Sequence, residues 1–123
     1  MTRWIVDGMN VIGSRPTGWW RDRPGAMREL VAELEAFAGR SGDEVTVVFD
    51  GKPFELSGER IEVRFASRSG PNAADDDIAA LVEDDAEPAE LSVVSSDADL
   101  ARRAADAGAA VVGAGEFRRR LDP

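Results

Sequence analysis

Short apolar runs rich in β-branched residues alternate along this chain with segments whose apolar residues recur every three or four positions. The first pattern is typical of buried strands and the second of helices that bury one face. Strands are predicted at residues 3–6, 44–50, 60–65, 90–96 and 109–113. Helices are predicted at residues 25–38, 72–82, 97–107 and 116–121. Because such alternation implies right-handed crossovers, we expect an α/β fold with a mainly parallel five-stranded sheet covered on both faces.

The turns and edges of this pattern carry more specific expectations. Residues 60–65 alternate polar and apolar side chains, which is typical of a half-exposed edge strand. Gly39 is expected to end the first predicted helix, and Gly8 is expected to allow a tight turn after the first strand. Residues 13–25 are rich in Gly, Pro and Arg and are predicted to form a loop.

Residues 1–123 are expected to form a single domain, because no repeat, low-complexity stretch or long linker divides them. A hydrophobic content of 43% and a charged content of 32% are typical of a folded globular protein. No leader-like segment and no apolar run of membrane-spanning length is seen, so a cytoplasmic location without membrane contact is expected.

The residue types that are missing restrict the chemistry. The chain has no cysteine and no histidine, which excludes disulfides, thiol nucleophiles, Ser-His-Asp triads and imidazole metal ligands. Any bound metal is therefore expected to be a hard cation that prefers oxygen ligands. The net charge of −9 argues against loose electrostatic attraction to nucleic acid. It does not exclude a nucleic-acid substrate, because acids gathered at a cation site stop repelling once the metal is bound.

Aspartates follow several of the predicted strands. Asp7 follows the first strand, Asp50 closes the second, and Asp97 and Asp99 follow the fourth. The carboxyl ends of parallel strands share one edge of a sheet, where ligands bind in open α/β folds. A run of three acids, residues 75–77, near the start of the next predicted helix is placed to contribute to the same edge.

Each of these acids taken singly has a structural explanation, because Asp is a favoured helix cap and turn residue. Together they would repel one another and raise each other's pKa values, a penalty that Mg²⁺ or Mn²⁺ removes. Asn10 could bind a phosphate, or orient a carboxylate or water, or simply form an Asx turn.

Four segments of the chain resemble, in order, the signature blocks of a known family. They read "IVDGMNVIG", "VTVVFDG", "FASRSGPNAADDDIAALVEDD" and "LSVVSSDADL". From Trp4 to about Leu121 the chain resembles the NYN-domain ribonucleases, in their YacP-like branch, within the PIN-like nuclease superfamily. The resemblance implies a three-layer α/β/α sandwich and a Mg²⁺- or Mn²⁺-dependent endoribonuclease.

The resemblance also implies roles for individual residues. The catalytic set it implies is Asp7, Asn10, Asp50, Asp75, Asp97 and Asp99. The implied metal ligands are Asp7, Asp75, Asp97 and Asp99. Asp50 would either bind the metal directly or hydrogen-bond to a group that does. Ser96 is the small hydroxyl residue before the last pair. Ala73 departs from the Ser or Thr usual in this branch, and Asp76 remains an alternative to Asp75.

RNA is expected to meet the loop after the first strand. This loop carries Arg15, Trp19, Trp20, Arg21 and Arg23. Aromatic rings with guanidinium groups suit single-stranded RNA; alternatively one or both Trp residues close the core, which we favour for at least one. Lys52 and Arg68 could hold phosphates or be solvated charges, and the terminal "FRRRL" is expected to be an exposed helix face. The predicted substrate contacts are Asn10, Arg15, Lys52, Arg68 and Ser96.

Three other functions share some of these sequence features. A haloacid-dehalogenase-type phosphatase is disfavoured because Met9 stands where its second Asp is needed, and the one Lys follows Asp50. An inactive RNA- or ribosome-binding module of the same fold would gain nothing from clustered acids. The sequence does not exclude a PIN-type toxin neutralised by an antitoxin partner, or a homodimer. It also does not determine the RNA target (single-stranded or structured), its cut site, or whether one or two metals bind.

Overall fold

The computed structural model describes residues 2–15, 17–70 and 72–122. Five parallel strands form one sheet in the order β3-β2-β1-β4-β5. The strands are β1 (Arg3–Asp7), β2 (Glu44–Phe49), β3 (Glu62–Phe65), β4 (Leu91–Val94) and β5 (Ala110–Val112). The helices are α1 (Gly8–Gly13), α2 (Arg23–Ser41), α3 (Ala73–Glu83), α4 (Ala98–Asp106) and α5 (Ala114–Leu121). Two 3₁₀ turns are η1 (Trp19–Arg21) and η2 (Pro88–Glu90).

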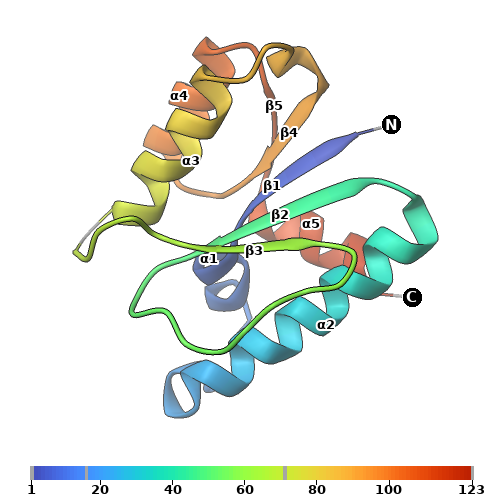
Figure 1. The fold of residues 1–123 in the computed structure, drawn as a ribbon, viewed down its shortest axis with the longest axis vertical. Coiled ribbons are helices and arrows are strands. Elements are labelled where there is room, and N and C mark those ends of the chain that lie inside the picture. The colour runs from blue at the N-terminus through green and yellow to red at the C-terminus, as the bar shows by residue number, and fades with distance from the viewer. Residues whose placement is uncertain (1, 16, 71, 123) are drawn as a thin grey trace.

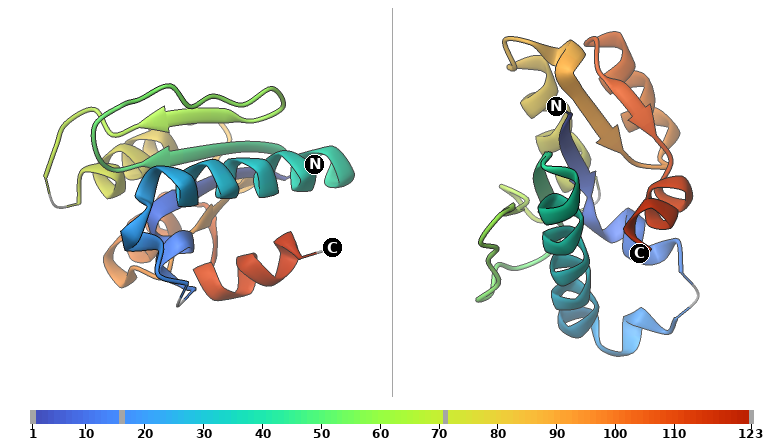
Figure 2. Two further views of the ribbon diagram at one scale, coloured as in Figure 1. Left: turned by 90° about the horizontal axis from the view of Figure 1, so that it is seen from below. Right: turned by 90° about the vertical axis from the view of Figure 1, so that its right-hand side faces the viewer.

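The sheet is the middle of three layers. Helices α1, α2 and α5 cover one face, and α3 and α4 cover the other (Figures 1 and 2). Successive residues of β1 serve both layers, since Trp4 and Val6 pack with the first group and Ile5 packs with the second. The expected α/β/α sandwich with a five-stranded parallel sheet is confirmed. Within the described residues, no helix combines the length and the apolar character needed to cross a membrane.

Helix α2 is longer than the sequence pattern predicted. It begins after Asp22, whose side chain accepts a hydrogen bond from the Gly25 N–H at 3.0 Å. The prediction that it ends at Gly39 is wrong, because the helix continues to Ser41. It stops at Gly42, where φ is +76°, a value that favours glycine.

Helix α1 was missed, because only a tight turn at Gly8 was expected before the loop predicted at residues 13–25. It begins directly after β1 at Gly8, where a Cβ atom would collide with the ring of Phe49. Glycine therefore lets the helix start against β2. Val11 and Ile12 are buried and hold α1 on the sheet. Six residues are too few to show a helical repeat in the sequence.

The strand order places β1 between β2 and β4, where the chain reverses its direction across the sheet. Asp7 pairs with Val48 of β2, so Asp50 lies two residues beyond its partner. Val6 pairs with Val94 of β4, so Ser95 is level with Asp7. In open α/β sheets, ligands bind outside the carboxyl ends of the strands at such a reversal point.

Candidate active site

Four carboxylates and two amides line one hollow of about 270 Å³ at the carboxyl edge of the sheet. Its lining residues are Asp7, Met9, Asn10, Asp50, Asn72, Asp75 and Asp97. They come from the end of β1, from α1, from the end of β2, from the start of α3 and from the loop after β4. We call this feature the acidic hollow.

Asp7 is the most deeply buried acid of the acidic hollow, with 5% of its surface exposed. The hydroxyl of Ser95, itself 2% exposed, donates to Asp7 Oδ2 at 3.1 Å. Burial raises the pKa of the Asp7 carboxyl to about 7, and the neighbouring charges of Asp75 and Asp50 act in the same direction. Asp7 therefore pays a clear energetic cost to carry charge in the metal-free protein.

Asp97 and Asp50 are each fixed by backbone hydrogen bonds. The Leu100 N–H donates to Asp97 Oδ1 at 2.9 Å, so Asp97 caps α4. The Ala74 N–H donates to Asp50 Oδ1 at 3.0 Å, which ties the end of β2 to the start of α3. Capping and site-forming were alternatives in the sequence. In the structure, Asp97 and Asp50 accept hydrogen bonds from the first turns of helices and also line the acidic hollow.

Asp75 and Asp76 point in different directions, as neighbours on a helix must. Asp75 lines the acidic hollow, and its pKa is raised by burial and by the charges of Asp97 and Asp50. Asp76 instead binds Arg103 at 2.9 Å and also Arg68. Hydrogen bonds from these two guanidinium groups lower the pKa of Asp76. The geometry thus favours Asp75 as the acid that faces the site.

Asn10 bridges two elements of the site. The Ser96 N–H donates to Asn10 Oδ1 at 2.8 Å. Because that oxygen is engaged, the amide N–H₂ group is left as a donor in the lining of the acidic hollow. Asn10 lies within α1 and bonds to a residue 86 positions away, so the Asx-turn interpretation is wrong. Ser96 accepts a hydrogen bond from the Ala114 N–H at 2.9 Å and so joins β4 to α5.

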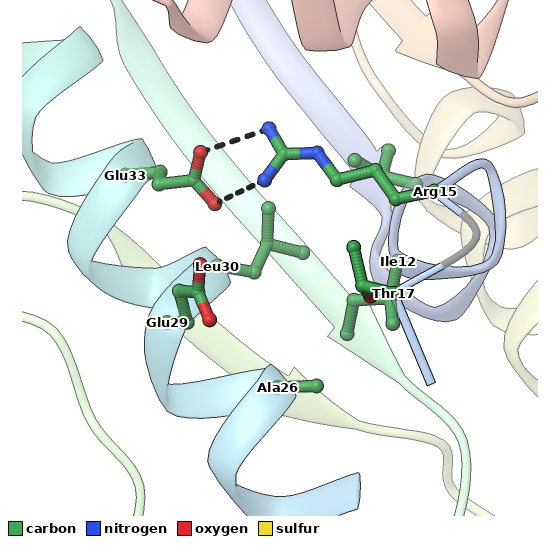
Figure 3. A pocket seen from close by; sticks show the side chains of 8 residues that line it. Ile12, Arg15, Thr17, Ala26, Glu29, Leu30 and Glu33 are labelled. Carbon is green, nitrogen blue, oxygen red and sulfur yellow. Dashed lines mark hydrogen bonds and ion pairs between the residues drawn. The ribbon is translucent and has the colours of Figure 1, made fainter. Parts of the chain in front are cut away.

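Three predicted site residues are bound to partners of opposite charge. Asp99 is exposed, does not line the acidic hollow, and accepts a hydrogen bond from Arg102 at 2.7 Å. Arg15 lies in a separate hollow between α1 and α2, where it holds Glu33 through two bonds of 3.2 and 2.9 Å (Figure 3). Arg68 is bound to Asp76, as described above. Their catalytic and substrate-binding roles remain predictions, as does that of exposed Lys52.

Two lining or supporting residues were missed in the sequence. Ser95 was placed inside the predicted strand at 90–96, but β4 ends at Val94 and Ser95 turns inward to Asp7. Its Oγ also accepts from the Asp97 N–H at 3.0 Å, so one hydroxyl links two acids. Asn72 has φ of +61°, a conformation that Asn tolerates better than most residues. The sequence signal that could have identified Asn72 as a lining residue is its position shortly before the acidic run at residues 75–77.

The donor set of the acidic hollow fits a hard divalent cation by its chemistry. None of the four carboxylates forms an ion pair with Arg or Lys in the described part of the chain. Across residues 2–15, 17–70 and 72–122, however, no three acids are arranged as a ready-made metal site. Mg²⁺ commonly takes only one or two protein carboxylates and keeps several waters, so its binding does not require such a trio.

The chain is similar to known proteins over nearly its whole length. The family model described as YacP-like NYN domain matches residues 4–123. The crystal structure of Rae1 (YacP) from Bacillus subtilis superposes with a TM-score of 0.82 and 25% identity, covering 99% of this chain and 74% of that one. Its W164L mutant gives the same score and identity and is covered to 76%. No curated protein sequence matches significantly. The chain therefore belongs to the YacP-like NYN domain family and has its nuclease-type fold.

Proposed function

We propose that this protein is an endoribonuclease that hydrolyses RNA phosphodiester bonds with the help of Mg²⁺ or Mn²⁺ bound in the acidic hollow. One observation carries the proposal: four carboxylates converge at the reversal point of the sheet with no ion-pairing Arg or Lys among the described residues. Membership of a family with a nuclease-type fold supports the same reaction class.

Asp7 and Asp97 are the proposed direct metal ligands, with Asp75 and Asp50 binding directly or through water. A bound divalent cation would polarise the scissile phosphate and lower the pKa of a coordinated water. Ser95 and the start of α4 hold Asp7 and Asp97 in place. Asp99 would have to release Arg102 before it could join this set.

The chain's own donors would orient the RNA. The amide N–H₂ of Asn10, in the lining of the acidic hollow, would donate to a phosphate oxygen at its rim. Lys52 is exposed two residues after Asp50 and would add a charge contact to a neighbouring phosphate. The proposed substrate is cytoplasmic RNA.

The test is cleavage of end-labelled RNA by the purified protein in Mg²⁺, in Mn²⁺ and in excess chelator. Removing one carboxylate at the site, by Asp7→Asn or Asp97→Asn, is expected to slow cleavage at least a hundredfold. Mutation of residues that only orient a metal ligand already lowers metal affinity or activity about 10- to 100-fold. Asp76→Asn is the matched control, because this neighbouring acid faces Arg68 and Arg103 instead of the acidic hollow.

Cleavage that persists in chelator, or that survives both substitutions in correctly folded protein, would contradict the proposal. RNA binding without any cleavage in either metal would instead favour the inactive RNA- or ribosome-binding module. Thermal melts of each variant, followed by circular dichroism, separate lost chemistry from lost folding.

A further inference from the structure

The paired tryptophans of η1 are separated by the fold. Trp19 is half-buried and packs against the core beneath α1 and α2. Trp20 is 62% exposed and is the one large hydrophobic side chain on the surface of the described residues. The two rings meet edge to face, with centroids 5.9 Å apart and planes at 82°. Trp19 therefore anchors η1, and Trp20 is held outward against a fixed neighbour.

The corner that carries Trp20 is tied to the acidic hollow. The Asp22 N–H donates to the Trp19 carbonyl at 3.2 Å, and Asp22 in turn caps α2. At the first position of α2, Arg23 Nη2 donates to the carbonyl oxygen of Asp50 at 3.0 Å. Asp50 is a wall of the acidic hollow. The exposed indole is thus three residues away from a guanidinium that contacts the site's own backbone.

The charges of this corner differ from those of the acidic hollow. Arg21, Arg23 and Lys52 are all exposed, and no carboxylate in the described residues forms an ion pair with any of them. In a chain of net charge −9, RNA would meet repulsion across most of the surface. Arg21 and Arg23 follow Trp20 in the chain, and Lys52 follows Asp50, whose carbonyl Arg23 contacts. This corner therefore offers a local exception, and its chemistry matches a nucleotide's flat base and charged phosphates.

We propose that Trp20 is a stacking platform for one unpaired nucleobase of single-stranded RNA, with Arg21, Arg23 and Lys52 holding the phosphates on either side. This subsite rests on the proposed function, because it assigns the strand that leads to the acidic hollow. Only a base outside a duplex can lay its face on an exposed indole. The platform therefore makes the protein prefer single-stranded over double-stranded RNA.

The test is binding of a fluorescein-labelled 12-nucleotide adenosine RNA to the whole chain, in chelator and at low salt, followed by anisotropy. Loss of one stacked base by Trp20→Ala is expected to raise Kd about 5- to 150-fold. Trp20→Phe keeps a ring and is expected to restore most of the affinity. A blunt-ended 12-base-pair RNA duplex, which has no unpaired base, serves as the control ligand, and its Kd is expected to be the same for wild type and Trp20→Ala.

Tryptophan fluorescence gives a second readout that a merely structural role would not change. RNA is expected to quench the wild-type emission and to leave Trp20→Phe nearly unquenched, because Trp4 is buried and Trp19 is half-buried. An unchanged Kd for the single-stranded RNA in a folded Trp20→Ala variant would overturn the proposal and would leave the exposed ring to a protein partner.

The two proposals fail separately. If wild type binds RNA through Trp20 but does not cleave it in Mg²⁺ or Mn²⁺, the endoribonuclease proposal is wrong and the platform stands. If wild type cleaves and Trp20→Ala has an unchanged Kd and an unchanged KM, the platform is wrong and the endoribonuclease proposal stands.

Discussion

The two ends of β1 both gather carboxylates, and they are neutralised in opposite ways. At the amino end, Arg3 holds Asp85 through two bonds of 2.8 Å and Glu90 through one of 3.2 Å. At the carboxyl end, Asp7 faces Asp50, Asp75 and Asp97 across the acidic hollow. There, within the described residues, neither Arg nor Lys forms an ion pair with them. One strand thus carries an internally neutralised cluster and an open one.

The pKa values follow this difference. Hydrogen bonds from Arg3 lower the pKa of Asp85 to about 2. Burial, and then the charges of its acidic neighbours, raise the pKa of Asp7 to about 7. Arg side chains do lie nearby, since Arg68 and Arg103 bind Asp76, next to Asp75, and Arg102 binds Asp99, two residues after Asp97. Leaving the hollow without one costs stability, which is common where a site must bind something the chain does not supply.

The largest expected effect is a loss of stability as the metal-free protein is taken from pH 4 to pH 8. Between pH 3.8 and about 7 the unfolded chain releases the Asp7 proton while the folded protein keeps it, so the free energy of unfolding falls. A pKa of about 7 in place of 3.8 corresponds to about 4 kcal/mol. In chelator at pH 8, Asp7→Asn is therefore expected to be more stable than wild type by up to that amount.

Urea denaturation at the two pH values measures this directly. The stability gained by Asp7→Asn should nearly disappear at pH 4, where the folded wild-type carboxyl is protonated and the unfolded one, with a pKa of 3.8, is only about half ionised. A substitution that destabilises the protein equally at both pH values would show that the open cluster carries no charge penalty.

Divalent cation should remove the same penalty. Mg²⁺ or Mn²⁺ at a hundredfold excess over its Kd is expected to stabilise wild type by about 2.7 kcal/mol at pH 8. Asp7→Asn should gain much less, because it loses both a ligand and the charge to be neutralised. Thermal melts with and without metal check this. The matched control is Asp85→Asn at the other end of β1, which should respond to metal as wild type does.

Ser95 tests how the open cluster is held together. Ser95→Ala removes the donor to Asp7 Oδ2 and the acceptor for the Asp97 N–H, both in buried or half-buried surroundings. Loss of such bonds is expected to cost about 1–3 kcal/mol in urea denaturation. Ser95→Thr keeps the hydroxyl and should recover the part of this loss that comes from hydrogen bonding. Equal losses in both variants would mean that packing, and not the hydroxyl, matters here.

The sequence was sufficient for the sheet and for the convergence of acids, because both depend on local patterns. Strand-like runs alternating with helical ones dictate the parallel sheet, and Asp7 and Asp50 follow their strands directly. Helix α1 was not predicted, because its six residues are too few to show a helical repeat and the helix is stabilised by contacts with the sheet.

Side-chain partners could not be predicted, because they depend on packing between segments far apart in sequence. Glu33, which binds Arg15, lies 18 residues further along the chain, and Arg103, which binds Asp76, lies 27 residues on. Nothing local distinguishes Asp76, which faces these guanidinium groups, from Asp75, which faces the acidic hollow. Two adjacent Trp residues look alike in the sequence. The sequence therefore could not predict that Trp19 would be half-buried and Trp20 exposed.

The smallest expected effect is at the neutralised end of β1. Because Arg3 lowers the pKa of Asp85, this carboxyl contributes stability above pH 3.8 that is lost as the pH falls toward 2. Asp85→Asn should therefore lower the melting temperature slightly at pH 7 and not at pH 2, which is opposite in direction to Asp7→Asn. The pair is partly exposed and is screened by solvent, so high salt should reduce the difference further. If Asp85→Asn and Asp7→Asn changed stability with pH in the same direction, the two ends of β1 would not differ in how their carboxylates are neutralised.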